Sequence, residues 1–105
     1  MAYTPNFAES EPSRAEIDAL TGPVLIEFGA PWCGHCQAAQ PLIAEVLAES
    51  PDLPHIKIED GPGRRLGRSF RVKLWPTLVL IKEGEELGRV VRPEVAGQIR
   101  SILTS

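Results

Sequence analysis

Residues 24–36 read VLIEFGAPWCGHC and join a predicted strand to the start of a predicted helix. The first five residues are almost continuously apolar, which is typical of a strand buried on both faces at the centre of an α/β sheet. Glu27 interrupts this apolar run. Residues 29–36 then read as a turn that leads into the helix, so Cys33 and Cys36 are expected where the strand gives way to the helix.

The segment that follows the cysteines has the periodicity of an amphipathic helix. Apolar residues recur at helical spacing at Ala38, Ala39, Leu42, Ile43, Val46 and Leu47. This pattern predicts a helix from Cys33 to about Ser50. Pro41 lies inside it, and since proline lacks a backbone N–H we expect a kink there.

The remaining sequence predicts alternating helices and strands. Upstream, Ser13–Glu16 has the spacing of a capping box and predicts a helix that ends at Thr21–Pro23. Downstream, the predicted elements are a strand over 55–59, a basic helix over roughly 64–70, a strand over 77–81, a hairpin turn at 83–84, a strand over 87–91 and a helix that begins at Pro93. The prediction is one α/β domain over 1–105, with a central mixed four- to five-stranded sheet flanked by helices. Residues 1–12 are expected to form an irregular arm or a short edge strand.

Composition and charge limit the classes of partner. The chain has 105 residues and a formal net charge of −3, and 43% of its residues are hydrophobic, as in a soluble single domain. Because phosphate binding needs a concentrated positive surface, this balance argues against nucleic acid as a partner. A local basic cluster is formed by Arg64, Arg65, Arg68, Arg71 and Lys73. We favour a solvated helix face over a docking patch for this cluster.

The N-terminal sequence bears on the expected location. It lacks the basic start and apolar run of a signal peptide, and no segment reaches the ~20 apolar residues that span a membrane. We therefore expect a cytoplasmic protein with no membrane partner, monomeric by default.

The two cysteines are separated by only two residues. A bridge between them closes almost no loop and removes little chain entropy, so the pair is better suited to reversible chemistry than to stabilising the fold. A thiol at a helix N-terminus faces unpaired N–H groups and the positive end of the helix dipole, which favours the thiolate. We therefore expect Cys33 to attack a partner disulfide, helped by His35 when it is protonated. The more buried Cys36 should then resolve the mixed disulfide.

These motifs together resemble the thioredoxin superfamily over nearly the whole chain. The residues that carry the resemblance, in family order and spacing, are Glu27, the WCGHC motif at 32–36, Pro41, Lys57, Trp75–Thr77 and Lys82–Glu85. The resemblance implies a thioredoxin fold and a thiol–disulfide oxidoreductase that acts on disulfide-containing protein substrates. It further implies a thioredoxin reductase as electron donor and no cofactor beyond the redox-active Cys33–Cys36 disulfide.

The resemblance also implies roles for individual residues. Pro76 would be a cis proline that faces the cysteines, and the backbone of Trp75 would pair with the substrate chain as an added strand. Glu27 would be a buried acid near Cys36 that relays a proton to or from it, with Lys57 beside it. A plain structural ion pair is the alternative for Glu27 and Lys57.

Some residues resemble a different branch of the superfamily or depart from its usual pattern. The Gly34-His35 pair between the cysteines is closer to a protein disulfide isomerase than to a bacterial thioredoxin, which implies a weaker reductant. Gly29 replaces a common aromatic residue, and Arg92 replaces a glycine that lines the substrate groove. With Trp32 and Trp75 framing the groove, these departures predict a narrower partner range.

Other functions remain open from the sequence. Zinc could in principle be bound by Cys33, Cys36, His35 and His55, but structural zinc sites need four converging ligands and only one close pair exists, so we expect no metal. A redox-silent interaction module of the same fold is a second alternative. A disulfide oxidase or isomerase is a third, because exchange at the cysteine pair runs in both directions.

Overall fold

The computed structural model describes residues 3–103, in which helices and strands follow one another in the predicted order. The elements are α1 (Arg14–Asp18), β1 (Pro23–Gly29), α2 (Gly34–Ala48), β2 (His55–Glu59), α3 (Arg65–Ser69), β3 (Thr77–Lys82), β4 (Glu85–Val91) and α4 (Ala96–Leu103). They form a sheet of order β2-β1-β3-β4, in which β1 and β2 are parallel and the other pairs are antiparallel. The mixed α/β sheet is thus confirmed with four strands. Residues 3–12 form an irregular arm without a strand; the first two residues of the predicted arm lie outside the described range.

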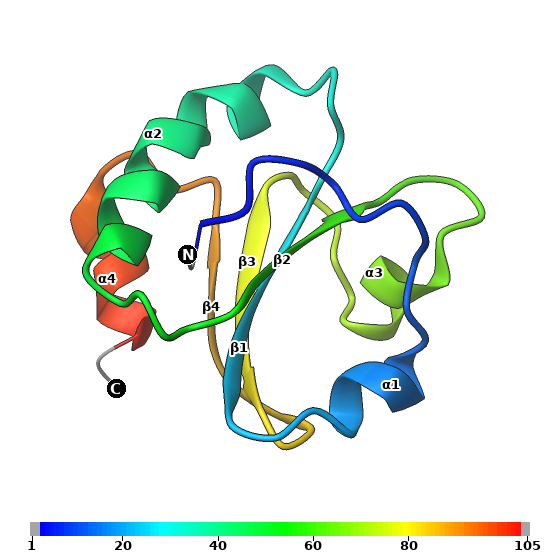
Figure 1. Ribbon diagram of the computed structural model, residues 1–105. Coiled ribbons are helices and arrows are strands. Elements are labelled where there is room, and N and C mark those ends of the chain that lie inside the picture. Colours follow the sequence, from blue (N-terminus) through cyan, green and yellow to red (C-terminus); the bar gives the residue numbers. More distant parts are fainter. Residues whose placement is uncertain (1–2, 104–105) are drawn as a thin grey trace.

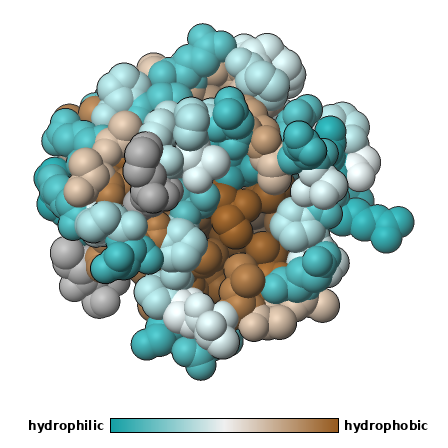
Figure 2. All heavy atoms as spheres, in the orientation of Figure 1, coloured by the Kyte–Doolittle hydropathy of each residue, from teal (hydrophilic) through white to brown (hydrophobic). Residues whose placement is uncertain are grey.

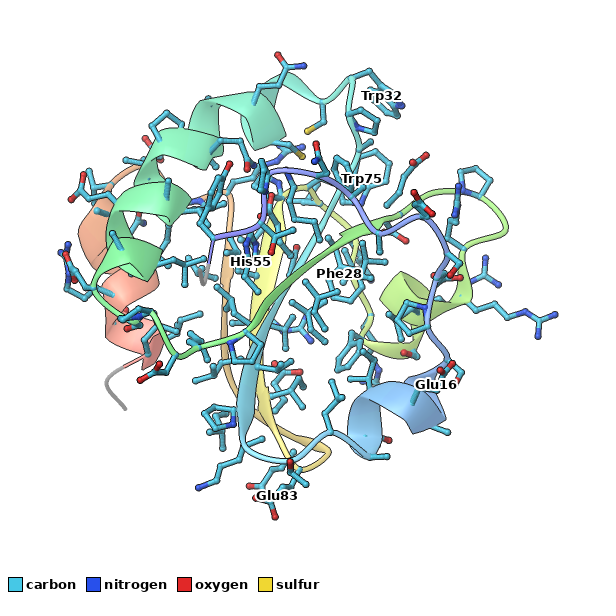
Figure 3. The ribbon with its side chains drawn as sticks, viewed as in Figure 1. Glu16, Phe28, Trp32, His55, Trp75 and Glu83 are labelled. Carbon is cyan, nitrogen blue, oxygen red and sulfur yellow. The ribbon has the colours of Figure 1, made fainter. Side chains whose placement is uncertain are left out.

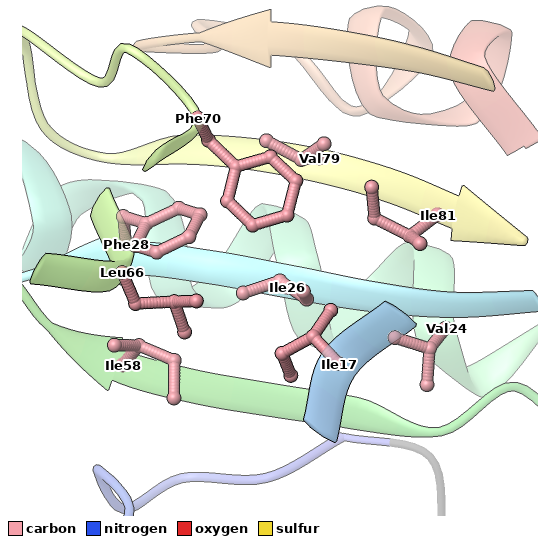
Figure 4. Close-up of a cluster of buried hydrophobic side chains, with 9 residues drawn as sticks. All are labelled: Ile17, Val24, Ile26, Phe28, Ile58, Leu66, Phe70, Val79 and Ile81. Atoms are coloured by element: carbon pink, nitrogen blue, oxygen red, sulfur yellow. The ribbon is translucent and has the colours of Figure 1, made fainter. Parts of the chain in front are cut away.

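Helices cover both faces of this sheet (Figure 1), α2 and α4 on one and α1 and α3 on the other. Because side chains of a strand alternate between faces, β1 contributes to two separate cores. On the α2 and α4 face, the core contains Leu25, Ala39, Ile43, Val46, Leu47, Leu78, Leu80 and Ile99. On the opposite face, Ile17 of α1 and Leu66 of α3 pack on strand residues that include Ile26 and Phe28 (Figure 4). β1 is therefore buried on both faces, as its apolar run predicts.

The helix boundaries differ from the sequence expectations by a few residues. α2 begins at Gly34, with Cys33 as its N-cap, and contains Pro41 as expected. The last helix begins at Ala96 rather than at Pro93. The side-chain oxygen of Gln98 accepts from the backbone N–H groups of Glu94 and Val95, at 2.6 and 3.1 Å, which holds these residues in a turn before the helix.

The hairpin turn is at the predicted residues. Glu83 and Gly84 both have positive φ, at 50° and 83°, as a two-residue hairpin connection between right-twisted strands requires. β4 begins at Glu85 rather than at residue 87, and the pairing register shifts between Leu80 and Ile81. This irregularity interrupts the alternation of the sequence, so the pattern alone predicts a later start for β4.

The surface is mainly polar. In the view of Figure 1, apolar residues are gathered near the middle of the face and are surrounded by polar ones (Figure 2). Within residues 3–103, no helix has the length and apolar character needed to cross a membrane.

Candidate active site

Cys33 lies at the N-cap of α2, directly after the buried strand β1. Its Sγ accepts a hydrogen bond from the backbone N–H of Cys36 at 3.2 Å. The same sulfur lies 4.0 Å from the carbonyl oxygen of Trp75. Both cysteines are free thiols, and both are buried. The predicted position of Cys33 at the helix start is confirmed. The N–H group aimed at its Sγ stabilises negative charge on the sulfur.

A groove of about 370 Å³ runs over Cys33 and is called the active-site groove below. Its lining residues are Trp32, Cys33, Gly34, His35, Lys73, Leu74, Trp75 and Arg92. These include Trp32, Trp75 and Arg92, which the sequence analysis expected at the groove, and the two residues between the cysteines, which we also expected to contact substrate. Trp32 is 72% exposed and meets Trp75 edge to face, with ring centroids 5.4 Å apart. The two tryptophans lie together at the start of α2 (Figure 3), so they frame the groove instead of packing in the core.

The peptide bond between Trp75 and Pro76 is cis, as the resemblance implied. Trp75 packs against the small cluster of Ala30, Cys33 and Cys36. Arg92 has a left-handed backbone, with φ of 49°, at the position where a glycine was expected. Its Nε donates to the carbonyl of Trp75 at 2.9 Å. Arg92 therefore both charges the active-site groove and holds a backbone acceptor at its centre.

Cys36 lies deeper than Cys33 and only 3% of it is exposed. Burial, followed by the hydrogen bond with Cys33, raises the pKa of the Cys36 thiol from 9.0 to about 12. Gly29 makes room for this sulfur, because a Cβ at that position would lie 2.7 Å from Cys36 Sγ. The departure at Gly29 that the sequence showed thus has a local reason.

The raised pKa of Cys36 predicts how the reduced protein responds to alkaline pH. Between the unfolded pKa of 9.0 and the folded pKa of about 12, the unfolded chain loses a proton that the folded chain keeps. Stability is therefore fully present below 9.0 and falls as pH rises through this window. We expect the denaturant midpoint of the dithiol form to fall over this range. The denaturant midpoint of the Cys36→Ser variant, which has no thiol at this position, should fall less over the same pH range. An equal fall in the two proteins would contradict the raised pKa of Cys36.

Glu27 is fully buried on the α2 face of β1 and belongs to a hydrogen-bonded network. Its Oε1 lies 2.9 Å from Nε2 of His55, and its Oε2 accepts from Nε2 of Gln40 at 2.8 Å. The backbone N–H of Thr4 donates to Nδ1 of His55 at 2.8 Å. Because Nδ1 is an acceptor, the proton of a neutral His55 is on Nε2 and points at Glu27.

Lys57 pairs with Glu27 along the backbone register of β1 and β2, but their charged groups do not meet. Its Nζ donates to the carbonyl of Pro5 at 2.9 Å and to Oε1 of Gln40 at 3.1 Å. Lys57 thus lies beside Glu27 in the sheet, as the resemblance implied, but the alternative of a direct ion pair between the two is not found. The side chain of Gln40 lies between them, donating to the acid and accepting from the lysine.

His55 and Gln40 were not assigned to this site from the sequence. Strand alternation could have found His55, since Ile56 and Ile58 face the core of α1 and α3, which places residues 55 and 57 on the other face. Gln40 carried a weaker signal, as a polar residue four positions after Cys36. The structure brings both to Glu27.

A small pocket of about 60 Å³ lies beside Cys36. It is lined by Phe7, Ala30, Pro31, Cys36, Gln37, Gln40 and Lys57. This volume is enough for water, which needs roughly 10–15 Å³ of such space. Within residues 3–103, no group of three or more His, Cys, Asp or Glu side chains is arranged to hold a metal ion.

Comparisons with known proteins agree with this geometry. A family model described as Thioredoxin matches residues 7–105. Thioredoxin H2-1 of Oryza sativa subsp. japonica is 37% identical over an alignment of 86 residues, and the match covers 75% of this chain but only 62% of that protein. The thioredoxin of Chlamydia trachomatis is 36% identical, with 82% of this chain and 76% of that protein covered.

Solved structures show the same similarity over a larger share of both chains. Thioredoxin 2 from Pseudomonas aeruginosa PAO1, in its reduced form, is 54% identical with a TM-score of 0.85, covering 96% of this chain and 94% of that one. Thioredoxin NaTrxh from Nicotiana alata is 28% identical with a TM-score of 0.71, covering 92% and 96%. The chain therefore belongs to the thioredoxin family of thiol–disulfide oxidoreductases.

Proposed function

We propose that this protein reduces disulfides of partner proteins with the dithiol of Cys33 and Cys36. The observation that carries the proposal is the placement of the two sulfurs. Cys33 Sγ caps a helix and lines the active-site groove, while Cys36 lies buried one turn further along the same helix. The first sulfur is reachable by a substrate, and the second is reachable from the first.

The exchange takes place in two steps. The Cys33 thiolate attacks one sulfur of the substrate disulfide; that S–S bond breaks, a mixed disulfide forms, and the first substrate thiolate leaves and takes up a proton. Cys36 then loses its proton, and its thiolate attacks Cys33 Sγ. The mixed disulfide breaks, the second substrate sulfur leaves as a thiolate and takes up a proton, and the Cys33–Cys36 disulfide forms. Two electrons have passed from the dithiol to the substrate.

The second step needs a base, because burial raises the pKa of the Cys36 thiol and the thiol holds its proton at neutral pH. We assign this role to Glu27. Its negative charge is close enough to contribute to the raised pKa of Cys36. The pocket of about 60 Å³ beside Cys36 gives water access to the sulfur, next to the Gln40 side chain that is bonded to Glu27. The proton would pass through water in this pocket to the carboxylate.

Net reduction is the direction we propose for a chain that acts in a reducing cytoplasm, with a thioredoxin reductase returning electrons to the disulfide. Typical reduction potentials of the two related classes are about −270 mV for thioredoxins and about −180 mV for protein disulfide isomerases. The Gly34-His35 pair moves the expected reduction potential of this chain toward that of the protein disulfide isomerases. A cytoplasmic poise of about −220 to −320 mV would still keep such a pair mostly as the dithiol.

Reduction of insulin tests the function directly. With a dithiol reductant in excess, the wild-type chain should accelerate insulin reduction, and the Cys33→Ser variant should not. Equilibration of the wild-type pair against glutathione then measures its potential. A potential as oxidising as about −120 mV, the value of a dedicated oxidase, would show that the chain oxidises its partners instead.

Arg92 is predicted to restrict the range of partners. A substrate strand that pairs with the backbone of Trp75 must displace Arg92 Nε from the Trp75 carbonyl, to which it donates at 2.9 Å. One hydrogen bond contributes about 0.5–1.5 kcal/mol, so Arg92→Gly should raise kcat/KM for insulin by roughly 2- to 10-fold. Arg92→Lys is the matched control, since it keeps the charge and lacks the Nε donor. An unchanged rate in Arg92→Gly would show that the contact does not limit substrate binding.

A further inference from the structure

A second pocket adjoins the active-site groove and is rich in positive charge. It has a volume of about 620 Å³, within the range of small-ligand sites. Its lining, here called the basic pocket, consists of Asp60, Gly61, Pro62, Arg64, Arg68, Arg71, Val72, Lys73 and Trp75. Lys73 and Trp75 also line the active-site groove, so the two hollows adjoin at these residues.

The single carboxylate of the basic pocket does not neutralise it. Asp60 accepts a hydrogen bond from the indole Nε1 of Trp75 at 2.9 Å, which fixes the tryptophan between the two hollows. Arg64 faces Glu59 at 3.6 Å, a long and exposed contact. Among the residues that the structure describes, no ion pair is found for Arg68, Arg71 or Lys73, and all three are exposed or half-buried at the surface.

The backbone at the start of α3 does not offer an additional anion site. Glu11 of the N-terminal arm accepts from the N–H groups of Arg65 and Leu66, at 3.3 and 2.9 Å. The side chain of Arg65 lines a different hollow, together with Glu11. Of the five cations in the basic cluster, four therefore converge on one pocket and one lies outside it. Arg71 holds left-handed backbone, with φ of 58°, which is uncommon for a non-glycine residue.

The overall charge makes this concentration of cations informative. The chain has a formal net charge of −3, so a positive field beside the reactive sulfur is a local feature and not a property of the whole surface. Charge of this kind attracts partners of opposite sign and raises the rate of encounter.

We propose that the basic pocket binds an acidic polypeptide segment that flanks the reacting disulfide in the protein substrate. The proposal rests on the reductase function proposed above and adds a substrate class to it. A substrate chain whose disulfide lies over Cys33 and that continues past Trp75 reaches the basic pocket, which adjoins the groove there. Glutamate or aspartate side chains on that continuation meet Arg68 and Arg71. The pocket thereby selects disulfides with acidic neighbours.

The test compares two versions of one disulfide-containing protein substrate. The acidic version has glutamate residues beside one cysteine of the disulfide, and the neutral version has glutamine at the same positions. The wild-type chain should reduce the acidic version with a kcat/KM about tenfold higher, as expected for two or three exposed ion pairs. The double variant Arg68→Gln/Arg71→Gln should bring this ratio close to one. Arg65→Gln removes a charge from the same helix but from outside the pocket, and should keep the ratio.

Salt provides a second readout that does not depend on variants. Raising the ionic strength from about 0.01 M to about 1 M shortens the Debye length from about 30 Å to about 3 Å, so the wild-type preference should disappear. A wild-type ratio of one at low salt, or a ratio that Arg65→Gln lowers as much as the double variant, overturns the pocket proposal alone. Failure of the wild-type chain to reduce either version overturns the reductase function and this proposal with it.

Discussion

Replacement of Cys36 by serine is expected to stop turnover while leaving the first exchange step in place. Cys33 keeps its position at the N-cap of α2 and still attacks the substrate disulfide, but no thiol is left to resolve the product. Multiple-turnover reduction should fall by on the order of 10³-fold or more, because a serine hydroxyl does not replace the thiolate. A covalent adduct between the variant and its substrate should accumulate, visible by mass spectrometry without reductant.

The Cys33→Ser variant is the matched control. It keeps the buried Cys36 thiol, whose pKa of about 12 leaves it protonated at neutral pH. We therefore expect neither turnover nor adduct from this variant. Turnover that survives Cys36→Ser unchanged would overturn the two-thiol mechanism. The stalled adduct also serves to isolate natural substrates, which can then be examined for acidic residues beside the bonded cysteine.

The second large effect is expected at Glu27. Glu27→Gln removes the proposed base while nearly preserving the shape of the side chain. Because general acid–base catalysis contributes about 10²- to 10⁴-fold, the step in which Cys36 resolves the mixed disulfide should slow by that factor at neutral pH. The step in which Cys33 attacks the substrate should keep its rate, which provides an internal control. Rapid-mixing experiments that follow tryptophan fluorescence separate the two steps, since Trp32 and Trp75 lie beside the sulfurs.

The pH profile distinguishes a base from a structural role for Glu27. Because burial raises the pKa of the Cys36 thiol, its spontaneous thiolate fraction at neutral pH is small and rises about tenfold per pH unit. The resolving rate of Glu27→Gln should therefore climb with pH and approach the wild-type rate under alkaline conditions. A rate that is equally low at every pH would indicate that Glu27 only supports the packing of Cys36.

The interactions of Glu27 were only partly predictable from the sequence. The resemblance implied a buried acid at Glu27, and the structure confirms that this side chain is fully buried. Lys57 was expected beside Glu27, and its backbone does pair with that of Glu27. The actual hydrogen-bond partners are His55 and Gln40, at 2.9 and 2.8 Å. The register of neighbouring strands can be inferred from the hydrophobic pattern of the sequence. The position of the end of a long side chain depends instead on the side chains packed around it.

The basic cluster shows a second limit of sequence interpretation. Its five positive charges predicted a solvated helix face, and the four that line the basic pocket do lie at the surface. Their convergence on one pocket beside the active-site groove depends on the position of α3 relative to the loop that carries Lys73 and Trp75. The spacing of the charges in the sequence does not give this convergence, because it is set by the turn after α3, where the backbone N–H groups of Arg71 and Val72 donate to the carbonyls of Arg68 and Gly67.

Local chemistry of the sequence was sufficient for the order of the elements, the burial of β1 and the placement of Cys33 at a helix start. Hydrophobic periodicity, turn residues and capping preferences act over a few residues, so they can be identified without the fold. Only the tertiary structure showed the contacts of Glu27 with His55 and Gln40, the contact of Arg92 with the Trp75 carbonyl and the position of the two hollows on either side of Trp75. Each of these depends on the approach of segments that are distant in the chain, and such approaches are set by the packing of both cores together.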